Sequence, residues 1–128
     1  VVDEAIRVFI DAGENASSLR SVEEMGESAY KGFEMEFSSY LRPIWWPYEH
    51  NWVDMTDWPN QKCPRTYKPN GYVDIVKVEN LARGTLWGDR KIGFVTPRTI
   101  EIDDEFDFWL AEQWVKRGRT FEVGREDL

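Results

Sequence analysis

Two acidic residues stand two positions apart near the end of the chain, Glu101 and Asp103, and isoleucines occupy the alternate positions 100 and 102. In an extended segment both carboxylates would project to one side, because successive side chains of a strand point to opposite faces. Two carboxylates held together offer the hard oxygen ligands that Mg²⁺ prefers, alongside water and substrate phosphate oxygens. An amphipathic strand with a solvated acidic face has the same pattern, so the spacing alone leaves both interpretations open.

A second signal lies earlier in the chain, where Pro69-Asn70-Gly71 precedes an apolar stretch. Asn and Gly tolerate positive φ better than other residues, so this tripeptide predicts a turn. The apolar residues that follow predict a strand over Tyr72–Val78. By itself the pattern indicates a turn that leads into a strand.

The segments 65–76 and 99–108, in this order and at this spacing, resemble the C-terminal half of the sugar-acid cytidylyltransferases, the acylneuraminate (CMP-sialic acid) synthetase family. The family's run Ile-Asp-Ile-Asp-Thr-Glu-x-Asp is followed closely from position 100, with Glu101 where the family usually has aspartate. The resemblance implies that Glu101 and Asp103 hold Mg²⁺. It also implies that Asp103 is the catalytic residue, which assists deprotonation of the attacking sugar hydroxyl.

The resemblance further implies a set of substrate-binding residues. In the family, an Arg/Lys-Pro-Asn-Gly run lines the sugar-acid pocket beside a glutamine-containing loop, a lysine faces the substrate's anionic groups, and bulky side chains cover the N-acyl region. The matching residues are Lys31, Gln61, Lys68, Asn70, Gly71, Tyr72, Leu86 and Trp87. Two positions depart from the pattern, since Asn60 replaces an arginine and Asp74 an aromatic residue. A solvated lysine and a tryptophan packed under a loop remain the alternatives for Lys31 and Trp87.

The hydrophobic pattern predicts helices that alternate with short strands, which indicates an α/β fold. The predicted helix that follows the acidic pair is capped by Asp103 or Asp104, ends near Arg117, and buries Phe106, Leu110 and Trp114. The other predicted elements are a helix at Val2–Ala12, strands at Ser17–Met25, Lys31–Phe37 (half-buried, antiparallel or at an edge), Tyr72–Val78 and Lys91–Thr96, a helical turn at Glu79–Arg83, and an extended piece at 100–102. The resemblance implies the C-terminal half of a doubly wound, mostly parallel three-layer domain like that of the nucleotide-diphosphosugar transferases.

Three parts of the chain are expected. Residues 1–118 form the C-terminal part of a cytidylyltransferase domain, and 119–128 form a tail that either adds a strand or stays without structure. Residues 38–62 form an irregular segment that holds Trp45, Trp46, Trp52 and Trp58. Long irregular segments in compact domains are usually functional, and aromatic clusters are typical of interface cores. We therefore expect 38–62 to form a homodimer interface that reaches over the sugar pocket.

Composition excludes several classes of function. The net charge of −8, with acidic residues spread along the chain, disfavours nucleic-acid binding. No apolar run approaches the roughly 18 residues of a membrane span. Cys63 is the only cysteine, which favours a reducing, cytoplasmic compartment. Neither Cys63 nor the only histidine, His50, has a partner at catalytic or ligand spacing, so neither is assigned a role.

The expected reaction transfers CMP from CTP to a sialic-acid-like nonulosonate, with Mg²⁺, and releases pyrophosphate. The chain starts at Val1 and has no counterpart of the family's phosphate-binding loop, Leu-Ala-Arg-x-x-Ser-Lys. It is therefore expected to be part of a longer enzyme and to be inactive alone. One alternative is a nucleotidyltransferase for another sugar acid, such as 3-deoxy-octulosonate or a legionaminate-like compound. The other is a non-catalytic carbohydrate-binding or dimerisation module.

Overall fold

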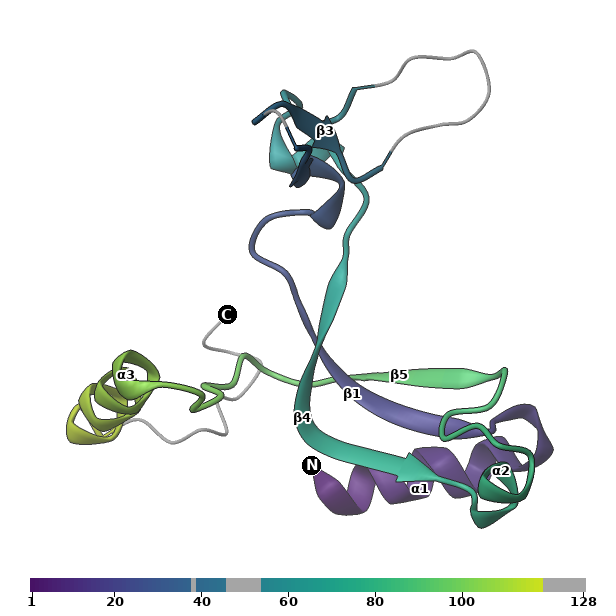
Figure 1. Ribbon diagram of the computed structural model, residues 1–128. Coiled ribbons are helices and arrows are strands. Elements are labelled where there is room, and N and C mark those ends of the chain that lie inside the picture. Colours follow the sequence, from purple (N-terminus) through teal and green to yellow (C-terminus); the bar gives the residue numbers. More distant parts are fainter. Residues whose placement is uncertain (38, 46–53, 119–128) are drawn as a thin grey trace. The chain divides into compact units, whose positions relative to one another are not determined.

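The structure is a computed structural model, and it describes residues 1–37, 39–45 and 54–118 (Figure 1). Trp46, Trp52, His50 and the tail 119–128 lie outside the described residues, so the expectations for them are not addressed. The chain divides into two compact units. The first joins Val1–Glu23 to the chain from Lys68 onward, and the second is Glu24–Tyr67. Each is described by itself.

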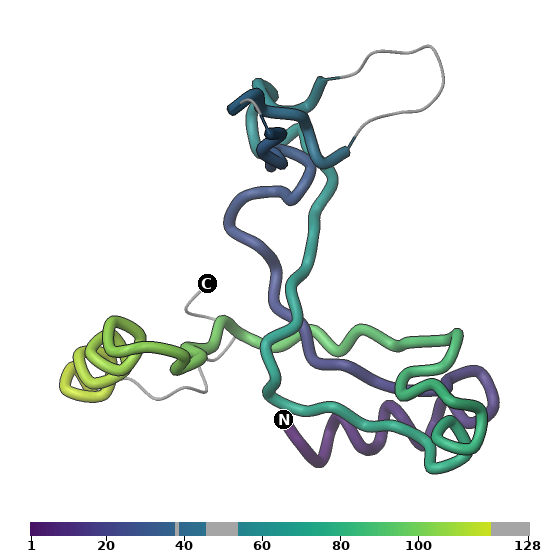
Figure 2. The backbone as a smooth tube through the Cα atoms, viewed as in Figure 1, coloured from purple at the N-terminus to yellow at the C-terminus, as the bar shows by residue number. Residues whose placement is uncertain are grey.

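The first unit contains a three-stranded sheet of order β4-β1-β5 (Figures 1 and 2). β1 (Ser18–Glu24) and β5 (Lys91–Val95) are parallel, with Ser18 opposite Lys91 and Val22 opposite Val95. β4 (Tyr67–Val76) runs antiparallel to β1, because Lys77 N donates to Ser17 O while Val73 N donates to Ser21 Oγ. The fold is therefore mixed α/β, as predicted, and its described sheet combines one parallel with one antiparallel pairing.

The first helix, α1, spans Val2–Ala12, the range that the sequence predicts. Asp3 and Glu4 in its first turn complement the positive end of the helix dipole. Gly13 follows at φ 52°, a conformation that glycine adopts without strain. Among the described residues of this unit, the buried apolar side chains are those of Ala5, Ala16, Leu19 and Ala111.

The Pro69-Asn70-Gly71 segment differs from its prediction. Gly71 does take a positive φ of 64°, but it lies inside β4, which already begins at Tyr67. The strand ends at Val76, and Val78 begins the short helix α2 (Val78–Ala82) instead of ending the strand. The Asn-Gly pair indicates only the local backbone preference of two residues. The length of β4 depends on its pairing with β1, which the local sequence does not show.

The last helix, α3, spans Glu105–Lys116 and is capped by Asp104, whose Oδ1 accepts from Asp107 N at 2.9 Å. Its predicted core face is wrong at two of three positions. Phe106 is 65% exposed and Leu110 39% exposed, whereas Trp114 is half-buried and Ala111 is buried. Apolar side chains lie on more than one side of α3, so its sequence does not select a single buried stripe.

The second unit holds a two-stranded sheet of β2 (Phe33–Met35) and β3 (Leu41–Pro43). The strands are antiparallel, as predicted, with Met35 opposite Leu41. The predicted half-burial is wrong, because Met35 is 72% exposed and Phe37 fully exposed. A pair of strands cannot cover its own faces, and both are exposed within the described part of this unit. The remaining elements are the 3₁₀ turns Gly13–Asn15 of the first unit and Ala29–Lys31 and Asn60–Lys62 of the second.

Within the described ranges, none of the helices has the length and apolar character needed to cross a membrane.

Candidate functional site

The carboxyl ends of the parallel strands β1 and β5 meet at one edge of the sheet, where α/β proteins usually bind ligands. Glu23, near the end of β1, is only 3% exposed. Its carboxylate accepts from Thr99 N at 2.9 Å and pairs with Lys68 Nζ at 3.1 Å. One buried carboxylate therefore joins β1 to the start of β4 and to the segment after β5.

Asn70 provides a second connection at this edge. It is 6% exposed, and its Nδ2 donates to Thr96 Oγ1 at 2.6 Å. The Thr96 hydroxyl donates in turn to Pro97 O at 3.0 Å, and Asn70 Oδ1 accepts from Tyr72 N at 3.3 Å. Both ends of the Asn70 amide are used within the protein, so this side chain fixes the strand edge. Tyr72 is half-buried in the same strand.

Glu101, the first residue of the predicted acidic pair, lies beside this edge. A Cβ placed on Gly71 would be 3.7 Å from Glu101 Oε1, which puts the Glu101 carboxylate against the backbone of β4. Glu101 and Asp103 are both exposed. Among the described residues, neither carboxylate has a hydrogen bond or ion pair. Both are therefore free to bind a ligand.

The neighbouring acids have a different role. Asp104 caps α3 by accepting from Asp107 N, and Asp107 Oδ2 accepts from the backbone N–H of Asp103, the residue before the cap, at 3.1 Å, so both side chains stabilise the start of the helix. The run of acids thus separates into two structural residues and two unpaired ones. Asp103 also borders a surface hollow of about 540 Å³ that Ile102 and Phe108 help to line.

The donor set fits Mg²⁺. The described residues contain no group of three or more His, Cys, Asp or Glu side chains placed to hold a metal. Mg²⁺, however, usually takes one or two protein carboxylates and completes its shell with water and substrate phosphates. Glu101 and Asp103, exposed and unpaired, match that requirement in type and number.

Leu86 and Trp87 lie at the opposite end of β1. The Trp87 carbonyl accepts from the hydroxyls of Ser17 and Ser18, each at 2.7 Å. Five residues of strand separate Ser18 from Glu23, which corresponds to roughly 17 Å. The structure therefore brings together Lys68, Asn70, Gly71 and Glu101, and it does not bring Leu86 or Trp87 to them.

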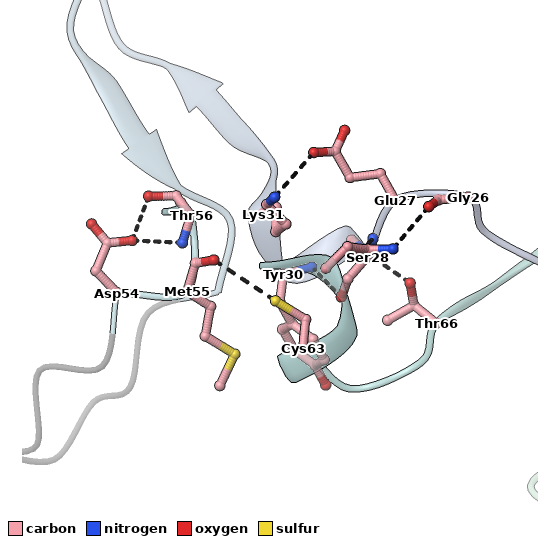
Figure 3. Close-up of polar contacts among 12 residues, drawn as sticks. Gly26, Glu27, Ser28, Tyr30, Lys31, Asp54, Met55, Thr56, Cys63 and Thr66 are labelled. Atoms are coloured by element: carbon pink, nitrogen blue, oxygen red, sulfur yellow. Dashed lines mark hydrogen bonds and ion pairs between the residues drawn. The ribbon is translucent and has the colours of Figure 1, made fainter. Parts of the chain in front are cut away.

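Lys31 and Gln61 belong to the second unit. Lys31 Nζ pairs with Glu27 at 3.5 Å (Figure 3). Gln61 is exposed and helps to line a pocket of about 290 Å³ with Ser28, Asn60 and Arg65. Lys68 and Glu101 belong to the first unit, and each unit is described by itself.

Two functional-looking residues escaped prediction from the sequence. Asn60 Oδ1 accepts from Ser28 N at 2.8 Å, and its Nδ2 donates to Gly26 O at 2.9 Å, so it closes the loop that Figure 3 shows around Ser28. Glu23, inside the predicted strand Ser17–Met25, is the second such residue. The signal that was available is its alternation with Leu19 and Ser21, since an acid on the buried face of a strand requires a partner.

No protein-family model matches the chain, and no curated protein matches it either.

Proposed function

We propose that this chain is the C-terminal half of a sugar-acid cytidylyltransferase domain. The whole domain would transfer CMP from CTP to an acidic, nonulosonate-type sugar and release pyrophosphate. The observation that carries the proposal is the exposed carboxylate of Glu101 beside the carboxyl-end edge of the sheet, with the exposed carboxylate of Asp103 two residues further along the chain. Neither carboxylate has a partner among the described residues. Their neighbours Lys68, Asn70 and Gly71 are those that the family resemblance assigns to the sugar pocket.

Glu101 and Asp103 are the residues that would hold Mg²⁺, and the ion would supply positive charge to offset the charge that develops on the phosphate during transfer. Asp103 accepts the proton of the anomeric hydroxyl as that oxygen bonds to the α-phosphorus and the bond to the β-phosphate oxygen breaks. Lys68 lies at the same edge, and its side chain is 57% exposed, so its ammonium can reach an anionic substrate. Positioning and electrostatics supply most of the catalysis in this kind of reaction.

The wider architecture belongs to the same proposal. The mixed sheet β4-β1-β5 would form one end of a doubly wound, three-layer domain whose other half carries the phosphate-binding loop. Lys31, Gln61 and Tyr72 would contact the sugar, whereas Leu86 and Trp87, at the opposite end of β1, are not assigned to the sugar pocket in this proposal. The enzyme would be a cytoplasmic homodimer that uses the segment 38–62 as its interface.

The test is pyrophosphate release from CTP by the full-length protein, with a panel of sugar acids. Release with a sialic-acid-like nonulosonate is the expected result. Release only with 3-deoxy-octulosonate or a legionaminate-like compound would keep the chemistry and change the sugar. Absence of release with every acid, at saturating Mg²⁺, would contradict the proposal.

A second candidate is favoured by the exposed aromatic side chains of the second unit. Phe37, Tyr40 and Trp58 are exposed there, and aromatic rings can serve as platforms for sugars. This candidate is a non-catalytic carbohydrate-binding or dimerisation module. It predicts a change in tryptophan fluorescence on adding saccharide that neither CTP nor Mg²⁺ alters, whereas the enzyme predicts a response to both.

A further inference from the structure

We propose that Glu23 is the positioning residue of this site, the group that sets Lys68 and the segment leading to Glu101 at fixed places along the sheet edge. The inference rests on the proposed function for its consequence in catalysis, although its structural part stands independently.

The burial of Glu23 is the first observation. Its side chain is 4% exposed, and a carboxylate removed from water is strongly destabilising unless it is paired and hydrogen-bonded. Both requirements are met by groups from other parts of the chain, the Lys68 ammonium at 3.1 Å and the Thr99 amide at 2.9 Å. Breaking either contact leaves an inadequately compensated buried charge, so the three groups hold one another in place.

The position of these partners is the second observation. Thr99 stands two residues before Glu101, and a Cβ on Gly71 would be 3.7 Å from the Glu101 carboxylate. The hydrogen bond from the Thr99 amide to Glu23 therefore determines where the segment that carries the acidic pair meets β4. The Lys68 bond fixes the cation three residues before Gly71 on the same strand. Glu23 thus controls the separation between the Lys68 ammonium and the Glu101 carboxylate.

The two contacts differ in what they require, which allows them to be tested separately. The Thr99 amide needs only an acceptor, whereas the Lys68 ammonium needs a negative charge. Glu23→Gln keeps an acceptor oxygen and removes the charge, so it should release Lys68 and retain the Thr99 bond. Glu23→Ala removes both.

The expected kinetic results, in the full-length protein, follow that division. Glu23→Gln should raise the KM for the sugar acid about tenfold and change kcat little, while Glu23→Ala should also lower kcat, by roughly 10–100-fold, and raise the Mg²⁺ requirement. The matched control is Glu112→Gln, which removes a carboxylate paired with Lys116 at 3.8 Å on the exposed surface of α3. It should leave KM, kcat and the Mg²⁺ requirement unchanged.

A second readout needs no activity, namely hydrogen exchange of the Thr99 amide measured by NMR. Exchange should be slow in the wild type and in Glu23→Gln, and about tenfold faster in Glu23→Ala. If both variants lower only thermal stability, with unchanged KM, kcat and Mg²⁺ requirement per active site, the positioning role is wrong. If the wild type transfers no CMP, the proposed function fails, and the exchange data alone decide the role: unchanged protection in Glu23→Ala overturns it. If Glu23→Ala does not fold, Glu23→Gln alone tests the positioning role. Faster exchange of the Thr99 amide or an unchanged KM in that variant would overturn the role.

Discussion

The two ends of β1 use polar groups in opposite ways. At the amino end, Ser17 Oγ donates to Trp87 O and accepts from Arg90 N, while buried Asn80 donates to Ser17 O and Leu86 O. Every one of these groups is used within the fold. At the carboxyl end Glu23 and Asn70 are equally well satisfied, but the carboxylates of Glu101 and Asp103 have no partner within the described part of the chain.

The two ends therefore differ in whether their polar side chains only stabilise the fold or can also bind a ligand. A saturated hydrogen-bond network rigidifies a structure and leaves little capacity for a ligand. At the carboxyl end such a network lies next to the Glu101 carboxylate, which has no partner among the described residues. A binding site needs this combination of side chains fixed by hydrogen bonds and ligating groups that remain available. The amino end has only the hydrogen-bond network that holds its side chains in place.

The largest expected effect tests the free groups. The double substitution Glu101→Gln with Asp103→Asn should lower the rate of pyrophosphate release about a thousandfold, because both proposed metal ligands lose their charge. The free energy of unfolding should change by less than about 0.5 kcal/mol, since both side chains are exposed and unpaired. Single-turnover kinetics and urea unfolding measure the two quantities.

The control for this experiment is the neighbouring cap. Asp104→Ala removes the acceptor of the Asp107 amide and should cost about 1 kcal/mol of stability, with little change in the Mg²⁺ requirement. Intact turnover in the double variant would show that the acids are only a solvated surface.

The next effect tests the packed amino end. Gly88 has φ 68°, and an added Cβ would lie 2.5 Å from Ser17 Cβ, too close for any side chain. Gly88→Ala should therefore destabilise the protein by about 2–4 kcal/mol. Gly84→Ala is the matched control, because Gly84 has a similar φ of 72° but open space around it, and it should cost only about 1 kcal/mol. Equal losses in urea unfolding would mean that backbone strain, and not the contact with Ser17, explains the glycine.

Trp87 tests whether the two ends differ in function as well as in packing. The Arg20 guanidinium lies 4.5 Å from the Trp87 ring centroid, and Lys91 Nζ lies 5.9 Å from it. Trp87→Leu should cost about 1–2 kcal/mol through lost packing and cation–π attraction, and leave the KM for the sugar acid unchanged. A rise in KM without loss of stability would place the amino end in the substrate site and remove the contrast.

Sequence reasoning succeeded where the cause is local. The bounds of α1 follow from its period and Gly13, and the cap at Asp104 follows from residue type at a helix start. It failed where partners are remote in sequence. Glu23 and Thr99 are 76 residues apart, and Asn60 and Ser28 are 32 apart, so no local pattern announces either contact. The exposure of Phe106 was missed for the same reason, since burial depends on what packs against a helix.

The smallest expected effect concerns Asp54, whose carboxylate accepts hydrogen bonds from a residue two positions away, in contrast to Glu101 and Asp103. The side-chain and backbone hydrogen bonds from Thr56, at 2.6 and 2.9 Å, lower the pKa of Asp54 below its ordinary value (Figure 3). A carboxyl group whose pKa is lowered in the folded state stabilises the protein at pH values above its ordinary pKa. That contribution is lost as the pH falls through the lowered pKa. Thr56→Val removes the hydroxyl donor and keeps the amide, so the pKa should rise toward its ordinary value without reaching it. An NMR titration of the Asp54 carboxyl carbon measures the shift, and an unchanged midpoint would show that the hydroxyl does not act on this carboxylate.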